Sequence, residues 1–160
     1  MRTNIDAQPI DKSPIILAAE ASDYDELINL WEESVVATHG FLSQSEIQDY
    51  KLLIYDYYFD AQNLYYIRDE YQIHGFIGLN GNFIQMLFIR PMFIGQGIGK
   101  ALIHFAIDKH GANNVDVNEQ NIPAVNFYQH LGFEVTERFD KDAAGKPHPI
   151  LSMKLRHVIN

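Results

Sequence analysis

Three glycines on alternate residues mark the stretch of this sequence that is best suited to bind a ligand. The segment Gly95-Gln96-Gly97-Ile98-Gly99-Lys100 follows an apolar run and precedes an amphipathic pattern. This order predicts a strand that ends, a loop without large side chains, and a helix that begins. The first N–H groups of a helix have no partner within it, and its dipole places partial positive charge there. The segment therefore indicates a socket for a phosphate group.

The spacing of these glycines excludes two familiar nucleotide-binding motifs. A dinucleotide fingerprint requires G-x-G-x-x-G, whereas Gly99 follows Gly97 one residue too early. A nucleoside-triphosphate loop requires G-x-x-x-x-G-K-[ST]. Gly99 and Lys100 fit that motif, but Ile94 stands at its first glycine and Ala101 at its hydroxyl residue. The loop therefore belongs to another class of phosphate binder.

The composition predicts one folded domain. The chain has 160 residues, of which 47% are hydrophobic and 21% charged, as in a typical globular protein. A formal net charge of -9 argues against nucleic-acid binding, which needs a basic surface, and would suit a cationic substrate. The lack of cysteine excludes disulfides, thiolate metal sites and a cysteine nucleophile. We expect residues 1–13 to form a loose lead-in and residues 14–160 to form the domain.

Neither a membrane segment nor a metal site is expected. No apolar run approaches the ~20 residues of a membrane span, and the polar N-terminus lacks the apolar core of a signal peptide. We therefore expect a cytoplasmic protein without a membrane partner. The seven histidines are scattered, with no H-x-x-x-H pair on any expected helix, so no metal ligand set is predicted.

Apolar periodicity predicts helices and strands in one α+β domain. Helices are expected from Ser22 to Thr38, from Ser43 or Ser45 past Tyr57, from Gly97 to His110, and from Asn121 to Leu131. Strands are expected at 14–19, 64–68, 73–79, 83–89, 114–117, 133–139 and 150–155, and Asn80-Gly81-Asn82 favours a tight hairpin.

The second expected helix is rich in tyrosine. Ile47, Tyr50, Ile54 and Tyr57 recur at helical spacing. Tyrosines in such a cluster either line a pocket that is apolar with a polar tip or pack against the sheet. A third interpretation is a dimer face, which would make the protein a homodimer.

A second motif shows which family the glycine loop resembles. The segment from Asn121 to Phe133 resembles the N-x-x-A-x-x-F-Y-x-x-L-G-F block of the GNAT family of acetyl-CoA-dependent N-acetyltransferases. Gly97 and Gly99 match that family's Q/R-x-x-G-x-G/A loop, which here departs at Ile94, where arginine or glutamine is usual. The order of elements agrees along nearly the whole chain. Three further segments (37–42, 117–121 and 145–149) resemble one bacterial subgroup of the family.

The resemblance implies the fold and the reaction. The GNAT acyl-CoA N-acyltransferase fold is a three-layer α+β structure with about four helices. Its mixed, mostly antiparallel sheet has about seven strands, of which the fourth and fifth splay apart. The implied activity moves the acetyl group of acetyl-CoA directly to a primary amine, on a small molecule or a protein lysine. The alternative is a non-catalytic module that senses acetyl-CoA or binds proteins, which the departure at Ile94 favours.

The resemblance also implies site residues. Tyr128 stands where the family has its general acid, and a tyrosine is protonated at neutral pH. His39, where the first two helices meet, is a candidate base because histidine titrates in the right range, and Glu119 is a second one. Each residue also has a plainer interpretation. Tyr128 could be an aromatic side chain of the core, His39 a favourable charge at a helix end, and Glu119 a solvated charge in a loop. Residues expected to hold acetyl-CoA are Leu87, Phe88, Ile89, Ile94, Gly95, Gln96, Gly97, Ile98, Gly99, Lys100, Asn121, Ala124 and Tyr128.

Overall fold

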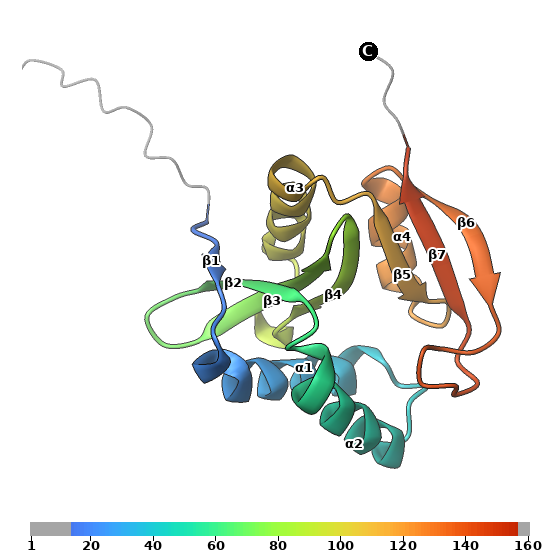
Figure 1. Cartoon of the computed structure of the whole chain (residues 1–160), viewed down its shortest axis with the longest axis horizontal. Coiled ribbons are helices and arrows are strands. Elements are labelled where there is room, and N and C mark those ends of the chain that lie inside the picture. The colour runs from blue at the N-terminus through green and yellow to red at the C-terminus, as the bar shows by residue number, and fades with distance from the viewer. Residues whose placement is uncertain (1–13, 157–160) are drawn as a thin grey trace, which may run out of the picture.

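The computed structural model describes residues 14–156, which form a sheet between two pairs of helices (Figure 1). The expected lead-in, residues 1–13, lies outside the described residues. The elements in chain order are β1 (Leu17–Ala18), the 3-10 turn η1 (Ala21–Asp23), α1 (Tyr24–Thr38), α2 (Gln44–Leu53), the π-helical turn η2 (Ile54–Tyr58), β2 (Asn63–Arg68), β3 (Ile73–Asn80), β4 (Phe83–Ile89), the 3-10 turn η3 (Pro91–Phe93), α3 (Ile98–His110), β5 (Asn114–Asn118), α4 (Ile122–His130), β6 (Phe133–Phe139) and β7 (Ile150–Leu155).

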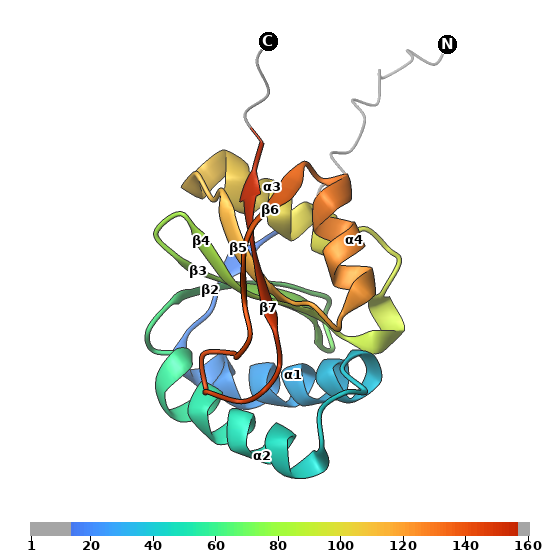
Figure 2. The same ribbon diagram turned by 90° about the vertical axis from the view of Figure 1, so that its right-hand side faces the viewer.

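The seven strands form one sheet in the order β1-β2-β3-β4-β5-β7-β6. Every neighbouring pair is antiparallel except β4 and β5, which are parallel. Helices α1 and α2 cover one face, and α3 and α4 cover the other (Figure 2). This architecture confirms the predicted mixed, mostly antiparallel three-layer fold. Within residues 14–156, no helix is long and apolar enough to cross a membrane.

Each face of the sheet has its own apolar core, because a buried sheet needs a helix layer on both sides. The core on the side of α1 and α2 includes Leu27, Leu30, Trp31, Phe59 and Phe76. The core on the side of α3 and α4 includes Ile77, Leu102, Ile103, Val115, Tyr128 and Phe133. The apolar strand β4 contributes to both cores, as its nearly continuous hydrophobic sequence predicts.

Strands β4 and β5 meet only at their beginnings. Their parallel pairing is limited to Phe83 with Asn114 and Ile84 with Val115. On the other side of β4, the register jumps so that Leu79 faces Ile84 while Gly78 faces Met86. One extra β4 residue lies at this jump, and such a bulge bends the strand that carries it. The predicted splay of strands 4 and 5 therefore starts at the bulge.

Three local predictions need correction. The first strand has only two residues, because only Leu17 and Ala18 pair with β2. The first helix begins at Tyr24 and not at Ser22, since a 3-10 turn precedes it. The second helix ends in a π-helical turn, which adds a residue to the turn and shifts the helical face. Tyr57 is consequently 66% exposed and does not continue the buried stripe.

Candidate functional site

The glycine loop presents a row of free backbone donors at the start of α3. Gly95 and Gly97 have left-handed φ angles of 85° and 83°, which glycine adopts without strain. The first N–H group that bonds back to this loop belongs to Ala101, which donates to the Gly97 carbonyl at 3.0 Å. Within the described part of the chain, the N–H groups of 95–100 have no acceptor. Together with the helix dipole, these donors fit a phosphate group.

Few cationic side chains surround this loop. Lys100 is exposed at the first turn of α3, whereas Ile94 is 54% exposed and contributes no charge. Arg90, which directly follows β4, is a further cationic side chain in this segment. Its guanidinium donates to the Glu33 carboxylate and to the Ile73 carbonyl, the latter at 3.0 Å from Nε. Binding at the loop therefore depends mainly on backbone N–H groups.

A narrow cavity of about 150 Å³ lies in the gap between the diverging strands. Its walls are residues 84–88 of β4 and 115–118 of β5, and the first turns of α4 close it with Asn121, Ala124 and Tyr128. Beyond Ile84, the edge of β4 that faces β5 pairs with no strand among residues 14–156. An extended amide-containing chain could therefore pair with the backbone of Leu87, Phe88 and Ile89, where the sequence predicted cofactor contacts.

Tyr128 lies in the wall of this gap. Its ring is 6% exposed and contacts Phe127 and Phe133 edge-on, with centroids 5.3 and 5.6 Å away. No residue among 14–156 forms a hydrogen bond with its hydroxyl. Burial raises the pKa of Tyr128 above its ordinary value of 10.0, so the hydroxyl keeps its proton throughout the neutral range.

His39 also lines the gap, from the end of α1. It follows the last residue of that helix and is 7% exposed, packed between the rings of Phe41 and Phe88. Burial lowers the pKa of His39 to about 4, because it disfavours the charged imidazolium. The ring is therefore neutral at pH 7, with a lone pair on one of its two nitrogens. Its Nε2 lies 3.5 Å from Asn121 Nδ2 at the start of α4.

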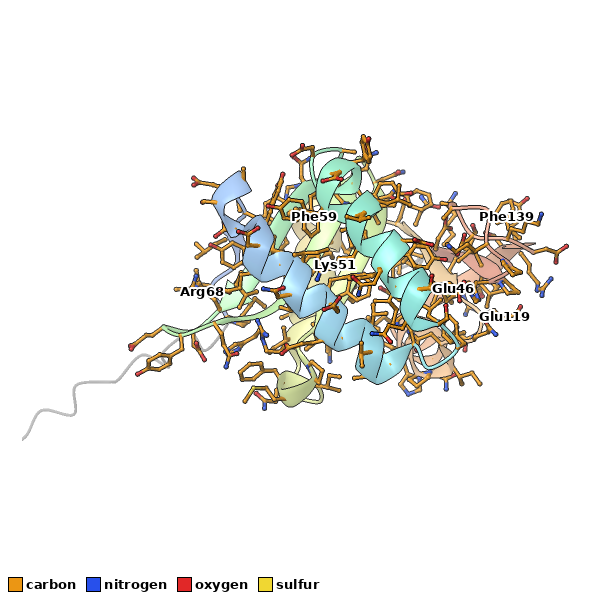
Figure 3. All side chains as sticks on the ribbon, turned by 90° about the horizontal axis from the view of Figure 1, so that it is seen from below. Glu46, Lys51, Phe59, Arg68, Glu119 and Phe139 are labelled. Carbon is orange, nitrogen blue, oxygen red and sulfur yellow. The ribbon has the colours of Figure 1, made fainter. Side chains whose placement is uncertain are left out.

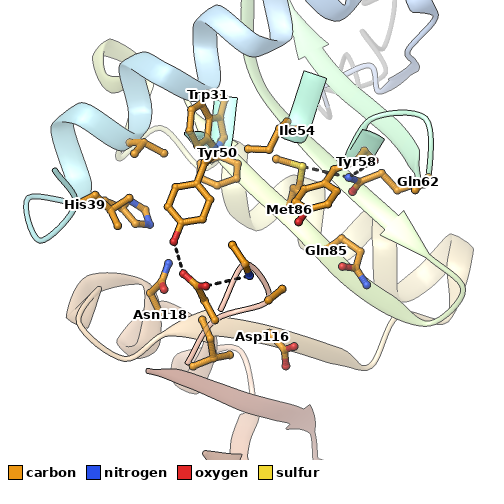
Figure 4. Close-up of a pocket in the computed structure, with 18 of the residues that line it drawn as sticks. Trp31, His39, Tyr50, Ile54, Tyr58, Gln62, Gln85, Met86, Asp116 and Asn118 are labelled. Atoms are coloured by element: carbon orange, nitrogen blue, oxygen red, sulfur yellow. Dashed lines mark hydrogen bonds between the residues drawn. The ribbon is translucent and has the colours of Figure 1, made fainter. Parts of the chain in front are cut away.

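A second cavity of about 400 Å³ adjoins the gap on the side of α1 and α2 (Figure 4). His39 and Phe88 line both cavities, so the two spaces share a wall. Apolar side chains make up much of the second cavity, including Trp31, Val35, Leu42, Ile54 and Met86. Tyr50 of the tyrosine-rich helix lines this cavity together with Tyr58 of the π-helical turn that follows, which agrees with the pocket interpretation for these two tyrosines.

Two carboxylates in the second cavity were not singled out from the sequence. Asp116 comes from β5, and Asp142 comes from the loop between β6 and β7. Asp142 accepts hydrogen bonds from the Tyr50 hydroxyl and from the backbone N–H groups of Ala144 and Lys146. The alternation of β5 gave a possible signal for Asp116, since the strand buries Val115 and Val117 and turns Asp116 the other way. No local pattern marks Asp142.

The structure does not bring Glu119 to either cavity. Its carboxylate accepts hydrogen bonds from Arg138 Nε at 2.6 Å and from a terminal nitrogen of Arg138 at 3.2 Å. Glu119 lies on the side of the molecule that carries Phe139 (Figure 3). The hydrogen bonds from Arg138 lower the pKa of Glu119, which makes it a weaker base. The geometry thus supports an ion-pair role for Glu119.

A family model, curated proteins and solved structures match this chain over most of its length. The family model of the acetyltransferase (GNAT) domain matches residues 32–155. The peptidyl-lysine N-acetyltransferase YjaB of Salmonella typhimurium is 40% identical over 129 residues, which cover 81% of this chain and 89% of that protein. The solution structure of apo YjaB from Escherichia coli has a TM-score of 0.80 at 35% identity and covers 88% of this chain and 95% of its own. The PaiA N-acetyltransferase of Thermoplasma acidophilum, solved with coenzyme A, has a TM-score of 0.69 at 23% identity and covers 89% and 99% of the two chains.

Proposed function

Since this chain belongs to the GNAT family of acetyl-CoA-dependent N-acetyltransferases, we propose that its acceptor is a lysine side chain of a protein. The family establishes the reaction class, the transfer of an acetyl group from acetyl-CoA to a primary amine. The finer assignment of the acceptor is supported by relatives named peptidyl-lysine N-acetyltransferases, at 40% and 31% identity. Small-molecule amines are the alternative class of acceptor.

The observation that carries this proposal is the lining of the second cavity, which is the larger of the two cavities that share His39 and is called the larger cavity below. Its apolar walls suit the methylene chain of lysine, which packs along apolar surface while its charged end remains solvated or paired. Its carboxylates, Asp116 and Asp142, favour a cationic guest. The wall shared through His39 and Phe88 puts the inner end of such a guest next to the gap between β4 and β5.

The residues around the gap fit acetyl-CoA. The N–H groups of 95–100 would receive its pyrophosphate, and the free edge of β4 would pair with its pantetheine amides. Bound acetyl-CoA supplies a thioester as the acyl donor. Asn121 already uses its Oδ1 to cap α4, accepting from Ala124 N–H at 3.3 Å, so only its amide Nδ2 is free for other contacts. Together, the N–H groups of 95–100 and the free edge of β4 would fix the thioester between the acceptor and Tyr128.

Two side chains would then move the protons. A lysine amine is almost fully protonated at pH 7 and must lose a proton before or during attack. His39 would accept it, because its ring is neutral and lines both cavities. As the new N–C bond forms and the C–S bond breaks, Tyr128 would donate its hydroxyl proton to the leaving sulfur. The acceptor nitrogen would lose its second proton, which restores the Tyr128 hydroxyl, and His39 would release the first proton to solvent. The neutral acetamide and free coenzyme A are the products.

A competition between acceptor classes tests the assignment. The enzyme is incubated with acetyl-CoA and either lysine-containing peptides with blocked N-termini or small amines, and free thiol is measured. We expect kcat/KM for the peptides to exceed that for small amines, with acetyl-lysine identified by mass spectrometry. The same peptides with arginine in place of lysine are the matched control. Faster turnover of a small amine than of every peptide would refute the protein-lysine assignment.

A further inference from the structure

A row of hydrogen bonds passes through His39 and joins the end of α1 to the start of α4. The Thr38 hydroxyl lies 2.7 Å from the Ser34 carbonyl oxygen and 2.7 Å from His39 Nδ1. On the other side of the ring, His39 Nε2 lies 3.5 Å from Asn121 Nδ2. Both ring nitrogens therefore have a partner, and the partners decide which nitrogen carries the proton.

The partner of Nδ1 requires a proton on that nitrogen. A backbone carbonyl can only accept, so the short contact to Ser34 uses the single hydroxyl proton of Thr38. The Thr38 oxygen then has only lone pairs to offer to His39. A contact of 2.7 Å between this oxygen and Nδ1 is favourable only if Nδ1–H donates. The threonine thus selects the Nδ1–H form of the ring.

The partner of Nε2 leads independently to the same form. Asn121 Oδ1 accepts from the Ala124 N–H group at the start of α4, which fixes the orientation of the side-chain amide. Its Nδ2, a donor, consequently faces the ring. A donor faces a lone pair, so Nε2 is the unprotonated nitrogen. The helix cap and the threonine, on different elements, agree on one tautomer.

We propose that Thr38 is a positioning residue that holds His39 as the Nδ1–H tautomer, so that the basic lone pair is on Nε2. This nitrogen faces Asn121 in the gap that receives the thioester, whereas Nδ1 faces the end of α1. The inference deepens the proposed function, because it rests on His39 as the proton acceptor. The proton taken from the acceptor amine goes to Nε2, which gives an imidazolium that Thr38 still stabilises through Nδ1–H.

The tautomer is tested without any activity measurement. Long-range 1H–15N correlation spectra of the ring distinguish a protonated nitrogen from one with a lone pair. At pH 7 the ring is neutral, so the tautomer is observed directly. We expect Nε2 to be the unprotonated nitrogen in the native protein and in Thr38→Ser. In Thr38→Val, which has no acceptor for Nδ1–H, we expect the proton to move partly or wholly to Nε2. A native ring protonated at Nε2 would overturn the inference.

Kinetics test the consequence for the reaction. For Thr38→Val we expect a loss of about tenfold or more in kcat, since a misplaced proton removes the basic nitrogen from the gap, with KM for acetyl-CoA unchanged. Thr38→Ser should retain native kcat. Thr136→Val is the matched control, because that threonine hydroxyl also donates to a carbonyl, at 3.2 Å, but on β6. It should leave kcat unchanged.

The outcomes separate this inference from the proposed function. A shifted tautomer in Thr38→Val with native kcat would show that Thr38 has no positioning role in catalysis. Native activity in His39→Gln would instead refute His39 as the proton acceptor, whatever tautomer the spectra show. A loss of kcat in Thr38→Val that Thr38→Ser restores, together with the shifted tautomer, supports the inference.

Discussion

Because His39 is buried, the protonation of its ring affects the free energy of unfolding of the protein. Its pKa falls from the ordinary 6.5 to about 4 because burial disfavours the imidazolium. Between these values the unfolded chain binds a proton that the folded chain does not, so the free energy of unfolding decreases as the pH falls from 6.5 to 4. This one group lowers the free energy of unfolding by roughly 3 kcal/mol at pH 4. Above pH 6.5 the ring is neutral in both states and has no such effect.

Urea unfolding at a series of pH values between 4 and 7.5 measures this effect. Carboxylates also titrate at the acid end, so the native protein is compared with His39→Gln. We expect the native free energy of unfolding to decrease more steeply with falling pH than that of the variant. Identical pH profiles would show that the ring is not held neutral by burial.

Tyr128 offers a clean separation of catalysis from stability. Its hydroxyl has no hydrogen-bond partner among residues 14–156, so Tyr128→Phe removes only the proton donor and retains the packed ring. We expect kcat to fall by about 100-fold, with the melting temperature and the affinity for acetyl-CoA little changed. Stopped assays of thiol release and calorimetric titration measure these quantities. A variant with native kcat would exclude Tyr128 as the general acid.

Residue types and spacing predict some of these side chains better than others. Tyr128 and Asn121 belong to a dense motif whose register on a helix fixes their neighbours, and both line the gap. His39 is predictable only as far as a position where two helices meet. Asp142 is not predictable, because its place depends on a loop that returns to α2 from 92 residues away in sequence. Long-range contacts of this kind leave no local pattern.

At the level of elements, the start of α3 is the part whose backbone geometry matters most. Alanine at Gly97 would be forced into a left-handed conformation at a cost of about 1 kcal/mol, and its methyl group would stand where a phosphate approaches. We expect Gly97→Ala to weaken acetyl-CoA binding about tenfold. Gly81→Ala is the control, since Gly81 has a φ of 59° in the β3–β4 hairpin and an added methyl group there would meet nothing within 4 Å.

Both variants should lose a similar amount of stability, measured by chemical unfolding, but only Gly97→Ala should lose affinity in a calorimetric titration. Equal affinities for acetyl-CoA would mean that the backbone at Gly97 does not contact the cofactor. The comparison works because the two glycines have the same kind of conformation and differ only in their place in the fold.

The same elements show where prediction from sequence ends. Apolar periodicity locates the helices and strands, and the cap at Ser43 is confirmed, with Glu46 completing a capping box. The bulge in β4 and the π-helical turn after α2 were not predicted, although the first starts the gap and the second places Tyr58 in the larger cavity. Each inserts one extra residue into a regular element, and tertiary packing stabilises that insertion. The local sequence therefore carries no periodic signal for it.

At the scale of the molecule, two halves of the sheet are joined weakly at β4 and β5 and are connected again through α2. Helix α2 contacts the β6–β7 loop through three polar pairs, which lie on one face of the helix. They are Tyr50 with Asp142, Asp49 with Lys146 at 3.0 Å, and Glu46 with His148 at 2.5 Å. These contacts form a bridge beside the larger cavity, whose walls include Tyr50 and Asp142.

The bridge should control acceptor binding and not cofactor binding. In Tyr50→Phe, Asp142 loses a hydrogen bond to its carboxylate, so we expect the loop to loosen and KM for the acceptor peptide to rise several-fold, with a loss of about 1–2 kcal/mol in stability. Affinity for acetyl-CoA should be unchanged, because the N–H groups of 95–100 lead into α3, which covers the face of the sheet opposite α2 (Figure 2). Tyr55→Phe is the matched control: its hydroxyl also donates to a carboxylate, Asp25 at 2.6 Å, but outside this cavity. Equal peptide KM values for the two variants would show that the hydrogen bond between Tyr50 and Asp142 has no part in holding the acceptor.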